Sequence, residues 1–147
     1  VFVVQFHHQD TKSTKMHKEH EPLPPRTEEA ARDVVDAAIA VHRVLGPGLL
    51  ESAYEACLAH ELDRRGRSVL RQVGLPIVYE AIRLEARYRI DLIVDGSVIV
   101  EVKSVDAIAP IHEAQLLTYL RLSERRLGLL INFNVVLLKQ GIKRMIL

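Results

Sequence analysis

The chain has 147 residues, about the length of one domain, with 48% hydrophobic and 27% charged residues. These fractions are close to the globular average and exclude wholesale disorder or a fibrous architecture. The formal net charge of +1 excludes binding built on bulk positive charge. No run approaches the ~20 apolar residues of a membrane span, so no membrane partner is expected. The single cysteine, Cys57, excludes an intrachain disulfide and favours a reducing, cytoplasmic location.

Residues 1–26 differ in composition from the rest of the chain. They hold four of the seven histidines and three of the six prolines, and they show no periodic apolar pattern. This composition predicts a flexible leader, followed by one domain over residues 27–147. The four histidines could bind a metal, but a solvated tail is favoured because nothing fixes them together. The first methionine, Met16, is a candidate start, in which case residues 1–15 would not belong to the native protein.

Two helices are predicted to open the domain. The first begins near Thr27, carries apolar residues at helical spacing, and ends at the Gly46-Pro47-Gly48 break. The second runs from about Leu49 to Arg65 and stops at Gly66.

After Gly66 the apolar period changes from helical to alternating, and β-branched residues become common. One further helix is expected over about residues 110–122. The expected strands cover residues 68–73, 75–80, 88–94, 98–103, 127–133 and 142–147. This order predicts an α/β fold with a mixed central sheet flanked by helices.

A first candidate site lies on two successive strands. Asp91 precedes a Glu101-x-Lys103 pattern, and strand alternation puts Glu101 and Lys103 on one face. Two converging carboxylates repel each other unless a cation lies between them, and oxygen ligands suit Mg²⁺ or Mn²⁺. The alternative is an ordinary cross-strand surface ion pair. From these residues alone the surface pair is favoured.

The loop between these strands decides whether the two carboxylates can meet. A two-residue loop at Asp95-Gly96 would place Asp91 opposite Val100, and therefore on the face away from Glu101. A three-residue loop that includes Ser97 pairs Val94 with Val98 and Asp91 with Glu101. The metal-site hypothesis therefore requires the three-residue loop, or a bend near Asp91.

Three other features have ordinary structural explanations. Glu51 lies in the first turn of the second helix, where a carboxylate complements the helix dipole. On the third helix His112, Gln115 and Tyr119 follow one side, as boundary residues commonly do. Clusters of arginine and lysine are more often solvated surface than nucleic-acid contacts when the overall charge is near zero.

Six motifs in order nevertheless resemble a known family, the GxxExxY proteins of the PD-(D/E)XK nuclease-like superfamily. The resemblance covers about residues 30–147. Its most distinctive string is Gly48-Leu49-Leu50-Glu51-Ser52-Ala53-Tyr54. The other motifs lie at residues 88–92, 99–103, 112–120, 128–133 and 141–144.

The resemblance implies a restriction-endonuclease-like core and assigns roles to individual residues. By that likeness Lys103 is the catalytic lysine, and Gln115 supports the site. Ile90 stands where the superfamily name has proline, a frequent variation. The implied ligands of Mg²⁺ or Mn²⁺ are Asp91, Glu101, the Val102 carbonyl and, directly or through water, Glu51.

The function expected from the resemblance is metal-dependent hydrolysis of phosphodiester bonds in DNA or RNA, with DNA the more expected partner. Lys103 would assist at the nucleophile or the transition state. The alternative is a non-catalytic nucleic-acid-binding or assembly module that keeps the nuclease-like fold. A third, weaker reading is hydrolysis of a smaller phosphate ester. A homodimer is left open, since cutting both strands would benefit from one.

Overall fold

The computed structural model describes residues 5–6 and 21–147. The predicted leader, residues 1–26, therefore falls largely outside the described residues. Where it is described, the chain already contacts the domain. The guanidinium of Arg126 donates a hydrogen bond to the Glu21 carbonyl at 2.7 Å, and Leu23 packs against the core.

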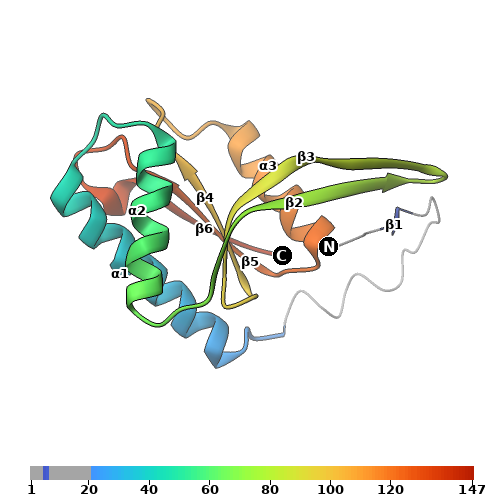
Figure 1. Ribbon diagram of the computed structural model, residues 1–147, viewed down its shortest axis with the longest axis horizontal. Coiled ribbons are helices and arrows are strands. Elements are labelled where there is room, and N and C mark those ends of the chain that lie inside the picture. Colours follow the sequence, from blue (N-terminus) through green and yellow to red (C-terminus); the bar gives the residue numbers. More distant parts are fainter. Residues whose placement is uncertain (1–4, 7–20) are drawn as a thin grey trace.

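The described chain forms a mixed six-stranded sheet with helices on both faces (Figure 1). The predicted α/β fold, with a mixed sheet flanked by helices, is confirmed. The helices are α1 (Pro25–Leu45), α2 (Glu51–Arg64) and α3 (Pro110–Ser123), with a short 3-10 helix η1 (Leu138–Gly141). The strands are β1 (Gln5–Phe6), β2 (Val69–Tyr79), β3 (Ile82–Val94), β4 (Val98–Lys103), β5 (Leu127–Asn132) and β6 (Ile142–Ile146).

The strands lie in the sheet in sequence order. From β2 to β4 the neighbours are antiparallel, β4 and β5 are parallel, and β6 returns antiparallel to β5. Because parallel neighbours need a crossover, α3 connects β4 to β5 across one face of the sheet. The carboxyl end of β4, where Lys103 lies, is therefore next to the start of the long connection into α3.

Successive side chains of the central strands point to opposite faces of the sheet, and each face has its own hydrophobic core. On β4, Val98, Val100 and Val102 pack against α1 and α2, whereas Ile99 packs against α3. Both cores are built almost entirely from aliphatic side chains, which gives the sheet a rigid centre. Glu101 follows Ile99 at a spacing of two, so it lies on the α3 face, where it is paired with Leu130 of β5.

Two strand predictions were wrong in extent. Residues 68–73 and 75–80 form the single strand β2, because Gly74 pairs with Arg89 instead of ending the strand. Strand β3 begins at Ile82, well before the predicted residue 88, and a tight turn at Glu80 and Ala81 joins the two. Alternating charged residues in this stretch resembled a loop, but they belong to a hairpin whose residues 82–85 are exposed on both faces of the sheet.

The β3–β4 hairpin adopts the register that the carboxylate pair requires. Val94 pairs with Val98, Ile93 with Ile99 and Leu92 with Val100, so the loop is Asp95-Gly96-Ser97. Asp95 has a left-handed backbone (φ 51°) and its carboxylate accepts hydrogen bonds from Ser68 N and Arg67. The three-residue loop is confirmed, and Asp91 is placed toward Glu101.

No helix in the described part of the chain is long and apolar enough to cross a membrane.

Gly141, where η1 meets β6, is expected to tolerate no side chain. An added Cβ would meet the backbone oxygen of Asn132, which cannot move aside as a flexible side chain does. We expect Gly141→Ala to lower the free energy of unfolding by about 1–3 kcal/mol in urea denaturation. Gly128→Ala, whose Cβ meets only the Leu116 side chain, is the matched control and should cost less. Equal unfolding midpoints for parent and Gly141→Ala would refute this close contact.

Candidate active site

Asp91 and Glu101 are brought together where β3 and β4 separate. The last paired residues of the two strands are Leu92 and Val100. Beyond them, the Asp91 backbone N–H donates to Glu101 Oε1 at 3.2 Å. The Val102 backbone N–H donates to Asp91 Oδ2 at 2.8 Å. Each carboxyl group therefore accepts a hydrogen bond from the backbone of the other strand. These bonds fix the two groups at the point where β3 and β4 separate.

Glu101 is 4% exposed and lies beside a second carboxylate. Burial, followed by the negative charge of Asp91, raises the pKa of Glu101 from its ordinary 4.5 to about 9. A hydrogen bond between the two carboxyl groups favours the protonated form further, while the Asp91 N–H and the charge of Lys103 oppose it. At neutral pH Glu101 therefore holds a proton, and a divalent cation could replace it. This donor set fits a hard metal ion.

A third acid, Glu55 of α2, was missed by the sequence reasoning. Its buried carboxylate accepts hydrogen bonds from Arg71 Nη2 at 3.0 Å and from Gln72 Nε2 at 2.5 Å. Gln72 Nε2 also lies 3.3 Å from Asp91 Oδ1, so one amide joins the two acids. Burial raises the pKa of Glu55, Arg71 opposes that rise and Asp91 adds to it.

Gln72 reaches both acids from an uncommon backbone conformation. Its φ is 51°, the left-handed region that few non-glycine residues adopt. Its carbonyl accepts a hydrogen bond from Arg89 Nη1 at 3.3 Å. Local backbone strain of this kind is often retained where it serves a site. The kink turns the Gln72 amide toward Glu55 and Asp91.

Glu51, the acid singled out by the resemblance, lies at the end of β4. Its carboxylate accepts a hydrogen bond from Ser104 N at 3.3 Å, and Ser104 Oγ donates to the Leu49 carbonyl at 2.6 Å. Within the described residues no hydrogen bond joins Glu51 to Asp91 or Glu101. The start of α2 is thus fastened next to Lys103, whereas Glu55, one turn later, makes the connection to Asp91.

Lys103 is half-buried at the end of β4, and its charge acts on Glu101. Its ammonium makes no ion pair or hydrogen bond within the part of the chain that the structure describes. The next strand, β5, brings Asn132 opposite Lys103. Asn132 Oδ1 accepts a hydrogen bond from the Val105 N–H at 3.1 Å, and Asn132 Nδ2 donates one to the Val105 carbonyl at 2.9 Å. These hydrogen bonds fix the chain just after Lys103.

Helix α3 lies beside the acids through Tyr119. Its ring is nearly buried, and burial together with the negative charges of Glu101 and Asp91 raises the pKa of Tyr119 to about 12. Gln115 is one turn earlier, and no hydrogen bond joins it to either acid within the described chain. His112 Nδ1 accepts a hydrogen bond from Ala109 N at 3.0 Å, so this histidine caps the helix.

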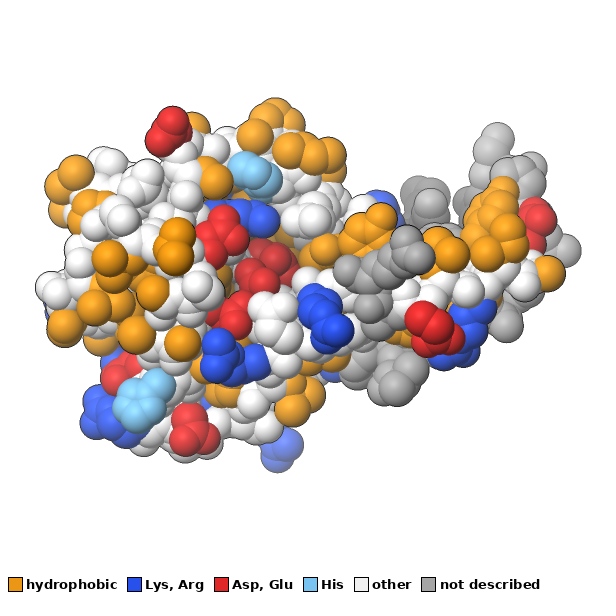
Figure 2. All heavy atoms as spheres, turned by 45° about the horizontal axis from the view of Figure 1, so that its top comes forward, with side chains coloured by type: hydrophobic (Ala, Val, Ile, Leu, Met, Phe, Trp, Pro, Cys, Tyr) orange, Lys and Arg blue, Asp and Glu red, His pale blue; other side chains and the backbone are white. Residues whose placement is uncertain are grey.

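One face of the molecule carries acidic and basic side chains close together. Figure 2 shows acidic side chains gathered near the middle of one face, with lysine or arginine side chains beside them. Among the described residues, no group of three or more His, Cys, Asp and Glu side chains is arranged to hold a metal. The site is therefore a carboxyl pair, with Glu55 linked to it through Gln72.

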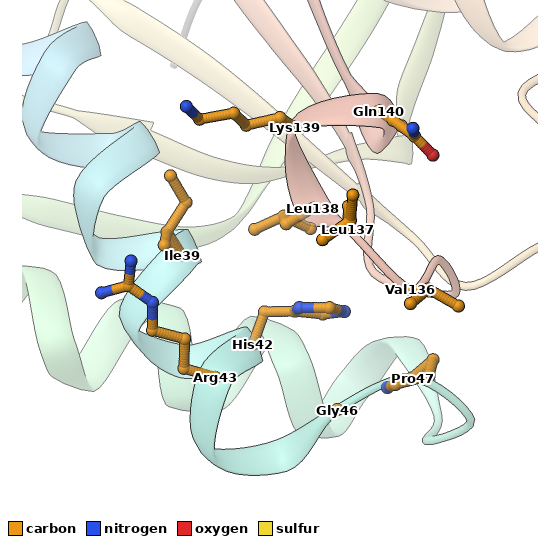
Figure 3. A pocket seen from close by; sticks show the side chains of 10 residues that line it. All are labelled: Ile39, His42, Arg43, Gly46, Pro47, Val136, Leu137, Leu138, Lys139 and Gln140. Carbon is orange, nitrogen blue, oxygen red and sulfur yellow. The ribbon is translucent and has the colours of Figure 1, made fainter.

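A separate cleft of about 690 Å³ lies away from these acids (Figure 3). It is formed where the end of α1 faces η1, and its walls include Ile39, Leu137 and Leu138. Neither Asp91 nor Glu101 lines it, so the carboxyl pair lies at a strand opening and not in this cleft.

Comparison with known proteins gives one match. The family model described as the PD-(D/E)XK nuclease superfamily matches residues 28–145. No curated protein and no solved structure matches the chain.

Proposed function

The chain belongs to the PD-(D/E)XK nuclease superfamily, and we propose that it hydrolyses phosphodiester bonds of nucleic acid with a divalent cation. The observation that carries this proposal is the Asp91–Glu101 pair, in which Glu101 is buried and has a raised pKa. The Lys103 ammonium, which has no ion pair among the described residues, lies close enough for its charge to act on Glu101. The string from Gly48 to Tyr54 further supports assignment to the GxxExxY branch.

Mg²⁺ or Mn²⁺ would be held by the Asp91 and Glu101 carboxylates, with the Val102 carbonyl as a further ligand. Glu55 is better connected to Asp91 than Glu51 is, through Gln72. We therefore assign Glu55 the supporting acidic role on α2, alongside Glu51. When bound, such an ion neutralises phosphate charge and lowers the pKa of water.

The chain's own groups have separate tasks. Glu101 gives up its proton when a cation replaces it, so both carboxylates become acceptors. The Lys103 ammonium, which has no carboxylate partner in the part of the chain that the structure describes, is available to a phosphate oxygen and to negative charge that develops there. Gln72 holds Glu55 and Asp91 in one arrangement. The cytoplasmic location, the preference for DNA and a homodimer stay predictions.

A second candidate function is a nucleic-acid-binding module that keeps this fold without cutting. It is favoured by the lack of a ready three-acid metal cluster among the described residues. The two proposals differ in a single observable, which is metal-dependent strand breakage.

A nicking assay on supercoiled plasmid separates the two. We expect the purified protein to convert plasmid to the open circular form with Mg²⁺ or Mn²⁺, and to do so no longer after addition of a chelator. Asp91→Asn should be inactive, whereas Asp36→Ala, which changes an exposed acid on α1, should cut normally. Binding without any metal-dependent nicking would favour the module instead.

Divalent-cation affinity is expected to rise with pH because of Glu101. Its pKa is raised from 4.5 to about 9, so in this range the folded protein holds a proton that the unfolded chain has lost. That contribution to metal-free stability is complete below 4.5 and is lost as pH rises through about 9. A cation must displace the proton, so affinity should increase by up to about tenfold per pH unit below 9.

Calorimetric Mn²⁺ titration in two buffers of different ionisation enthalpy measures this exchange. We expect release of about one proton per ion bound near neutral pH. Glu101→Gln, which has no proton to lose, should show none. Equal Mn²⁺ affinity at about pH 6 and about pH 8 would contradict the assigned role of Glu101.

A further inference from the structure

The β2–β3 hairpin extends well beyond the helices that cover the rest of the sheet (Figure 1). We call residues 75–88 the arm. Strand β3 continues from the arm directly into Asp91. At about 3.3 Å per residue, Ile82 near the turn lies about 30 Å along the strand from Asp91, and Tyr88 about 10 Å. The arm therefore continues the strand that carries the site, although the β2–β3 register shifts between Leu75 and Ile77 at its base.

One face of the arm is apolar. Directly opposed residues of an antiparallel pair share a face. The pairs on this face are Leu75–Tyr88, Ile77–Leu84 and Tyr79–Ile82. Leu75 and Ile77 belong to the core under α3, but the residues toward the turn leave that cover. Tyr79 is 55% exposed and Tyr88 is 47% exposed, and Ile82 and Leu84 are similarly open.

The exposed tyrosines of the described residues lie on this face. The chain has four tyrosines and no tryptophan. Tyr54 and Tyr119 are buried, and the other two, Tyr79 and Tyr88, are the exposed ones. Tyr88 is also close enough to Tyr119 to influence it, and Tyr119 in turn lies near Glu101 and Asp91. Tyr88 also lies three residues before Asp91 in β3, so the strand leads from the aromatic face to the carboxyl pair.

A positively charged residue lies along β3 between Tyr88 and Asp91. Arg71 is paired with Glu55 and Arg83 with Glu85, so their charges are compensated. Arg89 follows Tyr88 in β3 but points to the opposite face of the sheet, and within the described chain it donates to the Gln72 carbonyl. Its guanidinium has no carboxylate partner within the described chain, and it could therefore neutralise a phosphate.

We propose that the arm binds single-stranded nucleic acid, whose bases stack on Tyr79 and Tyr88 and whose backbone passes Arg89 toward the carboxyl pair. The proposal rests on the function proposed above for that pair. Exposed aromatic rings combined with a nearby cation are how proteins commonly hold unpaired strands. In a duplex the bases are stacked on one another, and their faces are not available to a tyrosine ring.

Fluorescence anisotropy of the full chain tests the arm. The probes are a labelled oligothymidine of about 20 nucleotides and a duplex of equal length, both with chelator present so that nothing is cut. We expect the single strand to bind more tightly. Tyr79→Ala and Tyr88→Ala should each weaken its binding by about tenfold or more. Tyr79→Phe and Tyr88→Phe, which keep the ring, should bind normally, as should Val44→Ala, which changes an exposed residue on α1.

Three results would overturn the proposal: tighter binding of the duplex, unchanged single-strand affinity in both alanine variants, or a switch from dimer to monomer in sedimentation of those variants. The last would make the face a contact between two copies of the chain. Cleavage is scored separately on the same samples with Mg²⁺. If the arm is wrong but the function is right, the alanine variants still cut; if the function is wrong, the parent binds the single strand without cutting it.

Discussion

Asp91→Asn is expected to lose both divalent-cation binding and cleavage. The substitution removes the negative charge of one of the two carboxyl groups but keeps an oxygen that can accept the Val102 N–H hydrogen bond. The fold should therefore survive, and thermal unfolding should match that of the parent. Loss of a metal ligand removes several kcal/mol of transition-state stabilisation, so cleavage should fall by about 10³-fold or more.

The loss should be visible in two independent measurements. Calorimetric Mn²⁺ titration should show no binding in the range where the parent saturates, and plasmid nicking should be absent. Asp36→Ala should leave both unchanged. If Asp91→Asn binds Mn²⁺ like the parent, the ion is held elsewhere and the assigned ligands are wrong.

Lys103→Ala is expected to lose cleavage but to keep divalent-cation binding, because it removes no metal ligand. The ammonium has no ion-pair partner in the described chain, so its loss should not disturb folding. Mn²⁺ should bind as well as to the parent, or slightly better for want of a competing cation. Cleavage should nevertheless fall by about 10²-fold or more, as when other preorganised electrostatic groups are removed.

For Lys103→Ala, single-turnover kinetics measure the cleavage rate, and a calorimetric Mn²⁺ titration of the same sample measures the metal affinity. Lys103→Arg, which keeps a positive charge in a different shape, should recover part of the rate. Cleavage by Lys103→Ala at the parental rate would mean that the lysine is only a surface group, and the mechanism would then need another cation.

The fold could be predicted where one local signal dominated. The Gly46-Pro47-Gly48 break and the aliphatic runs of β4 and β5 gave the right elements with small boundary errors. The prediction was wrong at β2 and β3, because a glycine inside a strand and alternating charges both resemble loop signals. Pairing of Gly74 with Arg89 and exposure of the hairpin explain these signals, and neither is visible in the sequence.

The candidate site was predictable only in part, for a related reason. Strand parity limited Asp91 and Glu101 to two arrangements, and the structure has the one with a three-residue loop. The sequence reasoning missed Glu55 because its hydrogen-bond partners, Arg71 and Gln72, lie on a different element, strand β2. The available signal was its position one helical turn after Glu51, next to the buried Tyr54.

The most direct test of the central claim is an anomalous difference map from a crystal of the protein soaked in Mn²⁺. The account predicts a peak between the Asp91 and Glu101 carboxylates, with oxygen ligands at roughly 2.0–2.6 Å. Glu101 should then be deprotonated and the Lys103 ammonium left free beside it. A map with no peak at this pair, at Mn²⁺ concentrations that support nicking, would contradict the metal centre.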